Sequence, residues 1–137
     1  MTLQCIEPHY IANFRLFPGF TTDILRSILQ QPIKGLILET YGSGNAQNND
    51  AAFLSVLNEA TQNNIIIINC TQCVQGRVEM GQYATSYSLA KAGVISGHDM
   101  TPEAAHCKLL TLISKGLNPA EIKEHMVESL CGELTVV

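Results

Sequence analysis

Short apolar runs along the chain alternate with segments in which apolar residues recur every three or four positions. Three runs, at residues 11–17, 36–38 and 65–69, are rich in β-branched, aliphatic or aromatic side chains, and the third opens with four isoleucines. Continuous runs of this length predict strands that are buried on both faces, as in a parallel sheet covered by helices. Turn residues follow the first two runs, at positions 18–19 and 42–45.

Helices are predicted between and after these strands. Thr22, Asp50 and Asn118 are residue types that cap helix N-termini, and Thr101 combines a cap with a following proline. A further short helix is predicted from about Tyr83 to a stop at Gly93. The side chains expected to face the core follow helical spacing: Leu25, Ile28, Leu29, Phe53, Val56, Leu57, Ala60, Ala105, Leu109, Leu112, Ile113, Ile122, Met126 and Leu130.

This alternation predicts an α/β fold with a small parallel sheet of about four strands flanked by helices, a flavodoxin-like or Rossmann-like sandwich. The length of 137 residues and the hydrophobic fraction of 46% are those of a single domain, residues 1–137. In such sheets the functional loops follow the carboxyl ends of the strands. Residues 42–48 and 70–81 are therefore the expected functional loops.

Composition narrows the classes of function. Eight basic and twelve acidic residues give a net charge of −4 with no basic cluster, which disfavours a nucleic-acid partner. The longest apolar run, residues 65–68, is far shorter than the roughly 20 residues of a membrane-spanning helix. Five scattered cysteines are an odd number and favour free thiols. We therefore expect a cytoplasmic protein that does not bind membranes.

The two expected loops carry motifs with more than one interpretation. Residues 42–45, Gly-Ser-Gly-Asn, lack the remaining residues of a phosphate-binding loop, so a tight turn is favoured. Cys70 and Cys73 have the spacing of a redox pair, but Gly76 and Gly81 disfavour a helix directly after Cys73. Small buried thiols are the alternative.

Metal and nucleophile chemistry find little support in the sequence. The histidines, His9, His98, His106 and His125, lie in unrelated segments without ligand spacing. His98 could interact with the neighbouring Asp99 or cap its loop. Thr71 is the one candidate nucleophile, and the only charged residues in its loop are Arg77 and Glu79, with no lysine close in sequence. The residues alone give no convincing catalytic set.

Six ordered blocks resemble those of bacterial type I L-asparaginases. They are Gly-Leu-Ile-Leu-Glu-Thr-Tyr-Gly-Ser-Gly-Asn-Ala (35–46), Asn-Cys-Thr-Gln-Cys (69–73), Gly-Gln-Tyr-Ala-Thr (81–85), Ala-Gly-Val-Ile-Ser-Gly (92–97), Asp-Met-Thr (99–101) and Gly-Glu-Leu-Thr (132–135). The Phe-Pro-Gly turn at 17–19 also matches. The resemblance covers the smaller C-terminal domain of that family.

The resemblance implies that catalysis requires an asparaginase N-terminal domain, which carries two catalytic threonines with an aspartate and a lysine. None of those motifs occurs here, so no catalytic residue is assigned to this chain. The implied reaction converts L-asparagine to L-aspartate and ammonia without a cofactor, in a homo-oligomer, dimer or tetramer. The sequence does not distinguish a preference for asparagine from one for glutamine as substrate. A tRNA-dependent amidotransferase subunit shares the asparaginase fold and is a more distant relative.

Two sets of site residues also follow from the resemblance. Asn45 is expected to contribute to the substrate pocket of a neighbouring subunit. Thr71, Gln72 and Cys73 correspond to a regulatory asparagine site, where Glu39 takes the place of the family's arginine. A carboxylate there would repel a ligand carboxylate, which predicts weakened regulation. A stand-alone amino-acid-binding module is the alternative function.

Overall fold

The computed structural model describes residues 3, 5–6, 8–46, 50–81 and 84–136. Within them, four parallel strands form one sheet in the order β1-β2-β3-β4. The strands are β1 (Ile11–Arg15), β2 (Gly35–Thr40), β3 (Ile66–Thr71) and β4 (Ile95–Ser96). The predicted α/β class with a small parallel sheet is confirmed.

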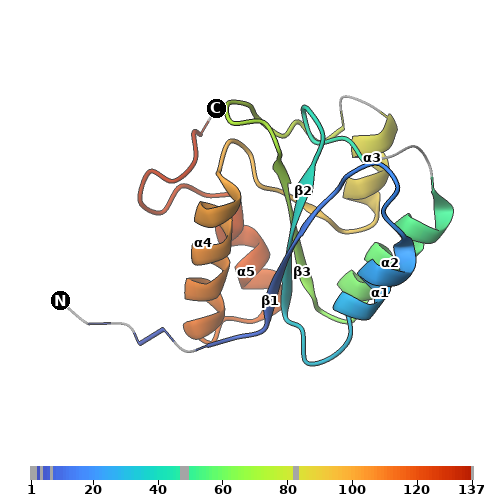
Figure 1. Ribbon diagram of the computed structural model, residues 1–137. Helices are drawn as coiled ribbons and strands as arrows, with labels where there is room; N and C mark the ends of the chain where they lie inside the picture. The colour runs from blue at the N-terminus through green and yellow to red at the C-terminus, as the bar shows by residue number, and fades with distance from the viewer. Residues whose placement is uncertain (1–2, 4, 7, 47–49, 82–83, 137) are drawn as a thin grey trace.

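The helices cover both faces of this sheet. They are α1 (Thr22–Ile28), α2 (Ala51–Gln62), α3 (Ala84–Lys91), α4 (Pro102–Ser114) and α5 (Pro119–Met126). Because the strands follow one another in sequence order, right-handed crossovers place α1, α2 and α3 on the same face. The helices after β4, α4 and α5, cover the opposite face (Figure 1).

Alternate side chains of the central strands supply two separate cores. Leu36 and Leu38 of β2 pack with the residues of α1, α2 and α3, whereas Ile37 packs with those of α4 and α5. In the same way Ile67 of β3 faces the first core and Ile68 the second. Burial on both faces accounts for the continuous apolar runs.

Most predicted helix ends are confirmed by their caps. Asp50 Oδ1 accepts hydrogen bonds from the backbone N–H groups of Ala52 and Phe53, at 3.0 and 3.4 Å. Thr101 caps α4, Asn118 forms a capping box with Glu121, and the glycine at position 93 has a φ of +92°. These local signals therefore set where the helices begin and end.

Some predicted positions are wrong. Thr22 is the first residue of α1, and Thr21 is its N-cap without a side-chain hydrogen bond. Leu130 lies beyond α5 and is 49% exposed because the helix ends at Met126. Strand β1 ends at Arg15 rather than at residue 17. Tyr83, the predicted start of a helix, and residues 47–48 of the first loop lie outside the described residues.

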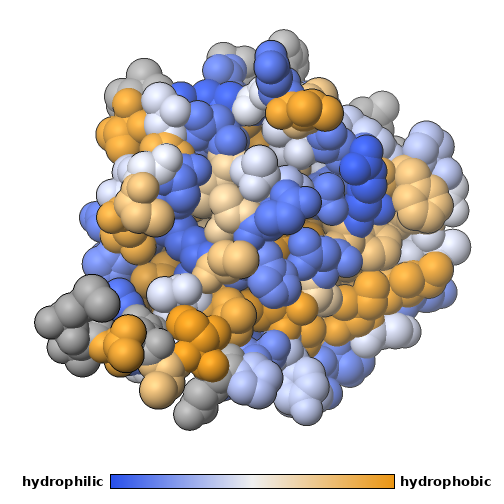
Figure 2. Space-filling view, turned by 60° about the vertical axis from the view of Figure 1, so that its left-hand side comes forward, coloured by the Kyte–Doolittle hydropathy of each residue, from blue (hydrophilic) through white to orange (hydrophobic). Residues whose placement is uncertain are grey.

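None of the helices in the described ranges is long and apolar enough to cross a membrane. Several large apolar side chains are nevertheless exposed, and the face seen in Figure 2 shows apolar groups in separate areas between polar ones. The most exposed members are Val74, Leu3 and Val136.

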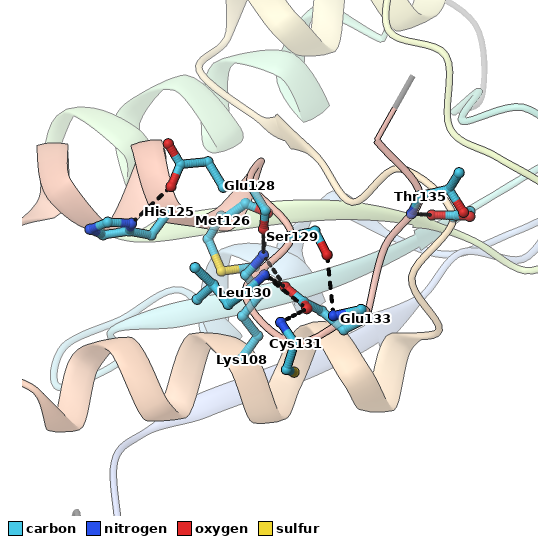
Figure 3. Close-up of polar contacts among 11 residues, drawn as sticks. Lys108, His125, Met126, Glu128, Ser129, Leu130, Cys131, Glu133 and Thr135 are labelled. Carbon is cyan, nitrogen blue, oxygen red and sulfur yellow. Dashed lines mark hydrogen bonds and ion pairs between the residues drawn. The ribbon is translucent and has the colours of Figure 1, made fainter.

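Lys108, a buried residue of α4, contacts the segment after α5 (Figure 3). Lys108 Nζ lies 2.6 Å from Glu133 Oε1 and donates hydrogen bonds to the carbonyl oxygens of Met126, at 3.1 Å, and Glu128. The Glu133 carboxylate also accepts hydrogen bonds from the backbone N–H groups of Leu130 and Cys131. Burial raises the pKa of Glu133, but these hydrogen bonds outweigh it and hold the pKa well below the usual 4.5.

We expect Glu133→Gln to lower the free energy of unfolding by about 3–5 kcal/mol near neutral pH, because it leaves Lys108 buried without its counter-charge. A depressed carboxyl pKa contributes stability above the unfolded-state value and loses it as pH falls. The difference between wild type and Glu133→Gln, measured by urea unfolding, therefore shrinks below a pH of about 4.5. The exposed control Glu124→Gln is expected to change the free energy of unfolding only slightly near neutral pH. A difference for Glu133→Gln that stays constant as the pH falls would contradict the prediction.

Candidate functional site

The turn after β2 is tight and closed on itself. Tyr41 and Asn45 exchange two backbone hydrogen bonds, each 2.8 Å long. Gly42 and Gly44 have φ values of +51° and +106°, a region that glycine adopts without strain. The interpretation of residues 42–45 as a tight turn is confirmed. Asn45, the residue carried over from the resemblance, is half-buried at its end.

The two thiols of residues 70–73 do not form a redox pair. Cys70 is fully buried in the core beneath α4, while Cys73 is exposed. Burial, together with the nearby charges of Glu39 and Glu103, raises the pKa of the Cys70 thiol to about 12. A buried thiol of this kind is inert, which supports the packing interpretation for Cys70. For Cys73 the expectation of a buried thiol is wrong, because its side chain is exposed.

The expected regulatory residues line one open pocket of about 540 Å³ at the carboxyl ends of β1, β2 and β3. Glu39 comes from β2, and Thr71, Gln72 and Cys73 come from the end of β3 and the loop after it. The first turn of α4 completes the wall. Asn45 is not among the lining residues, so the two expected sites are separate.

The polar side chains of this loop are used in structural hydrogen bonds. Gln72 Nε2 donates to the carbonyl oxygens of Leu16 and Glu39, at 2.5 and 3.0 Å. Thr71 Oγ1 donates to the carbonyl oxygen of Gly42 at 2.5 Å and accepts from the backbone N–H of Cys73 at 3.0 Å. These contacts of Thr71 include no general base, so they provide no activation of its hydroxyl as a nucleophile.

Arg15 also lines the pocket, and the sequence interpretation missed it. Arg15 is the register partner of Glu39 across β1 and β2, and its Nη1 lies 3.6 Å from Glu39 Oε1. The Arg15 side chain is 61% exposed and that of Glu39 17%. The carboxylate at position 39 therefore has a guanidinium beside it. Only the strand register, which the sequence does not specify directly, reveals this neighbour.

His98, His106 and His125 each contact a polar side chain. His98 Nδ1 lies 3.3 Å from Arg77 Nη2, and burial and the Arg77 charge lower the pKa of His98. Asp99 instead accepts a hydrogen bond from the backbone N–H of Thr135, so the loop interpretation of His98 fits better. His106 contacts Asn13 at 2.8 Å. Among the described residues, no three His, Cys, Asp or Glu side chains are grouped as metal ligands.

A model of the glutaminase/asparaginase C-terminal domain family matches residues 11–126. The chain belongs to this family. L-asparaginase 1 of Escherichia coli (strain K12) is 48% identical over 130 residues, which are 95% of this chain and 38% of that protein. The human 60 kDa lysophospholipase is 43% identical over 126 residues, 91% of this chain and 22% of that protein.

A solved structure gives the same assignment. The crystal structure of L-asparaginase I from Vibrio cholerae O1 biovar eltor superposes with a TM-score of 0.92 at 44% identity, over 98% of this chain and 40% of that one. The resemblance inferred from the six sequence blocks is confirmed. The chain thus spans about two fifths of the length of the asparaginases that it matches.

We expect iodoacetamide to alkylate Cys73 and to spare Cys70 while the chain is folded, because Cys70 is buried and its pKa is raised to about 12. Peptide mass spectrometry after timed labelling measures both rates. In denaturant both cysteines are expected to react, which controls for peptide recovery. Equal rates at the two thiols in the folded chain would contradict this and favour a redox pair.

Proposed function

We propose that this chain is the C-terminal, subunit-contact part of an L-asparaginase that hydrolyses L-asparagine to L-aspartate and ammonia, and that it is inactive alone. The observation that carries the proposal is 48% identity to L-asparaginase 1 across 95% of the chain. The Thr71 hydroxyl is hydrogen-bonded to Gly42 O, and the Cys70 thiol is buried. Both facts support the assignment of the catalytic nucleophile to a separate N-terminal domain. No cofactor takes part in the proposed reaction.

In this proposal Asn45 reaches the substrate pocket of a neighbouring subunit. An asparagine amide can donate to and accept from the polar groups of an amino-acid substrate. The closed turn supports such a role because a fixed backbone orients a side chain with little entropy loss on binding. Exposed apolar side chains such as Val74 and Phe17 offer contact surface for the N-terminal domain and for a homo-oligomer.

We expect Asn45→Ala, in the full-length enzyme, to lower kcat/KM for L-asparagine by roughly 10–100-fold, since a substrate contact and its orientation are lost. Coupled measurement of ammonia release gives the rates, and L-glutamine in the same assay measures substrate preference. The exposed helix residue Asn58 provides a matched control, because Asn58→Ala is expected to leave the rates unchanged.

The 137-residue chain alone should release no ammonia; turnover near 1 per second would overturn the proposal.

The pocket at Thr71, Gln72 and Cys73 supports a second role as a weakened regulatory site for an amino acid. Its lining includes one guanidinium, Arg15, and the carboxylates of Glu39, Asp99 and Glu103. The carboxylates attract the ammonium group of an amino acid and repel its α-carboxylate. Glu39 Oε1 also lies 3.6 Å from Arg15 Nη1 and competes with a ligand carboxylate for this guanidinium.

We therefore expect Glu39→Gln to tighten L-asparagine binding by about 10-fold, the scale of one charge-assisted hydrogen bond. Titration calorimetry of L-asparagine into the 137-residue chain, which in this proposal does not hydrolyse the amino acid, measures this affinity. The double variant Arg15→Met/Glu39→Gln is expected to lose the tighter L-asparagine binding, because it lacks the Arg15 guanidinium. Wild-type rates should depend hyperbolically on asparagine; a clearly sigmoidal dependence would contradict weakened regulation. Tight binding by the wild-type chain alone would favour a stand-alone amino-acid-binding module.

A further inference from the structure

Three successive carbonyl groups of the turn after β2 are each held by a donor from residues 69–79. Thr71 Oγ1 donates to Gly42 O at 2.5 Å, and Asn69 Nδ2 donates to Gly44 O at 3.1 Å. Between them, the backbone N–H of Glu79 donates to Ser43 O at 2.9 Å. The carbonyl side of the turn is thus bound along its length to the end of β3 and the following loop.

Two of these donors are side chains buried where an apolar residue would be expected. Asn69 is 0% and Thr71 5% exposed. Asn69 follows Ile65 and Ile67 on the same face of the strand, and both isoleucines belong to the first core. Burying an amide there costs free energy unless every polar atom is bonded. This asparagine therefore needs a reason other than core packing.

Both polar atoms of the Asn69 amide have partners. Its Oδ1 accepts from Thr40 Oγ1 at 2.5 Å, which fixes the orientation of the amide plane, and its Nδ2 also contacts Met80 Sδ at 3.4 Å. The turn packs directly on it: a Cβ added at Gly44 would lie 3.1 Å from Asn69 Nδ2 and 2.7 Å from Val78 Cγ1. The position of Gly44, and of the residue after it, follows from this contact.

We infer that Asn69 and Thr71 are positioning residues for Asn45. They hold the carbonyl oxygens of Gly44 and Gly42, and so fix the backbone from which the Asn45 side chain extends. This inference rests on the proposed role of Asn45 in a neighbour's substrate pocket. Neither residue needs to touch substrate; each acts through the geometry of the turn.

The test is a double-mutant cycle on kcat/KM for L-asparagine in the full-length enzyme. Thr71→Val removes the hydroxyl at constant shape, and Asn69→Leu removes the amide. Each is expected to lower kcat/KM about 10-fold in the wild-type background and less than about 2-fold in the Asn45→Ala background, because residues that act as one unit are not additive. Thr71→Ser, which keeps the hydroxyl, should recover most of the loss.

Ile67→Val separates positioning from general destabilisation. It shortens a buried side chain on the same strand and face, so it should lower the melting temperature without changing kcat/KM. Full additivity with Asn45→Ala, or unchanged kinetics for Thr71→Val, would overturn the inference while leaving the proposed function in place. Unchanged kinetics for Asn45→Ala itself would overturn the proposed role of Asn45 and the inference with it. If the Asn69→Leu variant does not fold, the Thr71→Val variant alone tests the inference.

Discussion

The pairing of β2 with β3 is the constraint on which the rest of the structure depends. Its register runs from Gly35 opposite Ile66 to Thr40 opposite Thr71. Because alternate side chains enter different cores, a slip of one residue would exchange the two sets and bury each against the wrong helices. The same register brings the last residues of both strands together. The β2–β3 register therefore sets both the division between the two cores and the proximity of the strand ends that carry Glu39 and Thr71.

The character of β3 changes along its length in a way that suits this arrangement. Its first residues are isoleucines, and polar side chains at Asn69 and Thr71 replace them at the carboxyl end without leaving the buried layer. β4 approaches this end closely, since Gly97 N–H donates to Asn69 O at 2.8 Å. A Cβ at Gly97 would lie 2.8 Å from both Asn69 O and Cys70 Sγ. Because residue 97 is glycine, its N–H can approach and hydrogen-bond the backbone carbonyl of Asn69. The side-chain amide of Asn69 hydrogen-bonds the turn after β2.

The sequence predicted what depends on local pattern. The long apolar runs identified β1, β2 and β3, and the caps at Asp50, Thr101 and Asn118 identified helix starts. Strand β4 was not located, because two residues are too few to show a period. Leu130 was expected to be buried because helical spacing says nothing of where the helix stops. Glu39 and residues 71–73 were expected in one site, but Arg15 was not, because it reaches them only through the β1–β2 register.

One atom, Thr71 Oγ1, connects the pocket to the turn that carries Asn45. Thr71 lines the pocket that contains Arg15 and Glu39, and its Oγ1 both accepts from Cys73 N–H and donates to Gly42 O. A hydroxyl that accepts one hydrogen bond while donating another polarises both, so the loop and the turn are coupled through it. A ligand changes a distant side chain only by as much as it binds one arrangement better than the other. A ligand in the pocket that leaves the hydrogen bond from the Cys73 N–H to Thr71 Oγ1 intact therefore does not affect the turn. A ligand that breaks this bond weakens the hydrogen bond from Thr71 Oγ1 to Gly42 O.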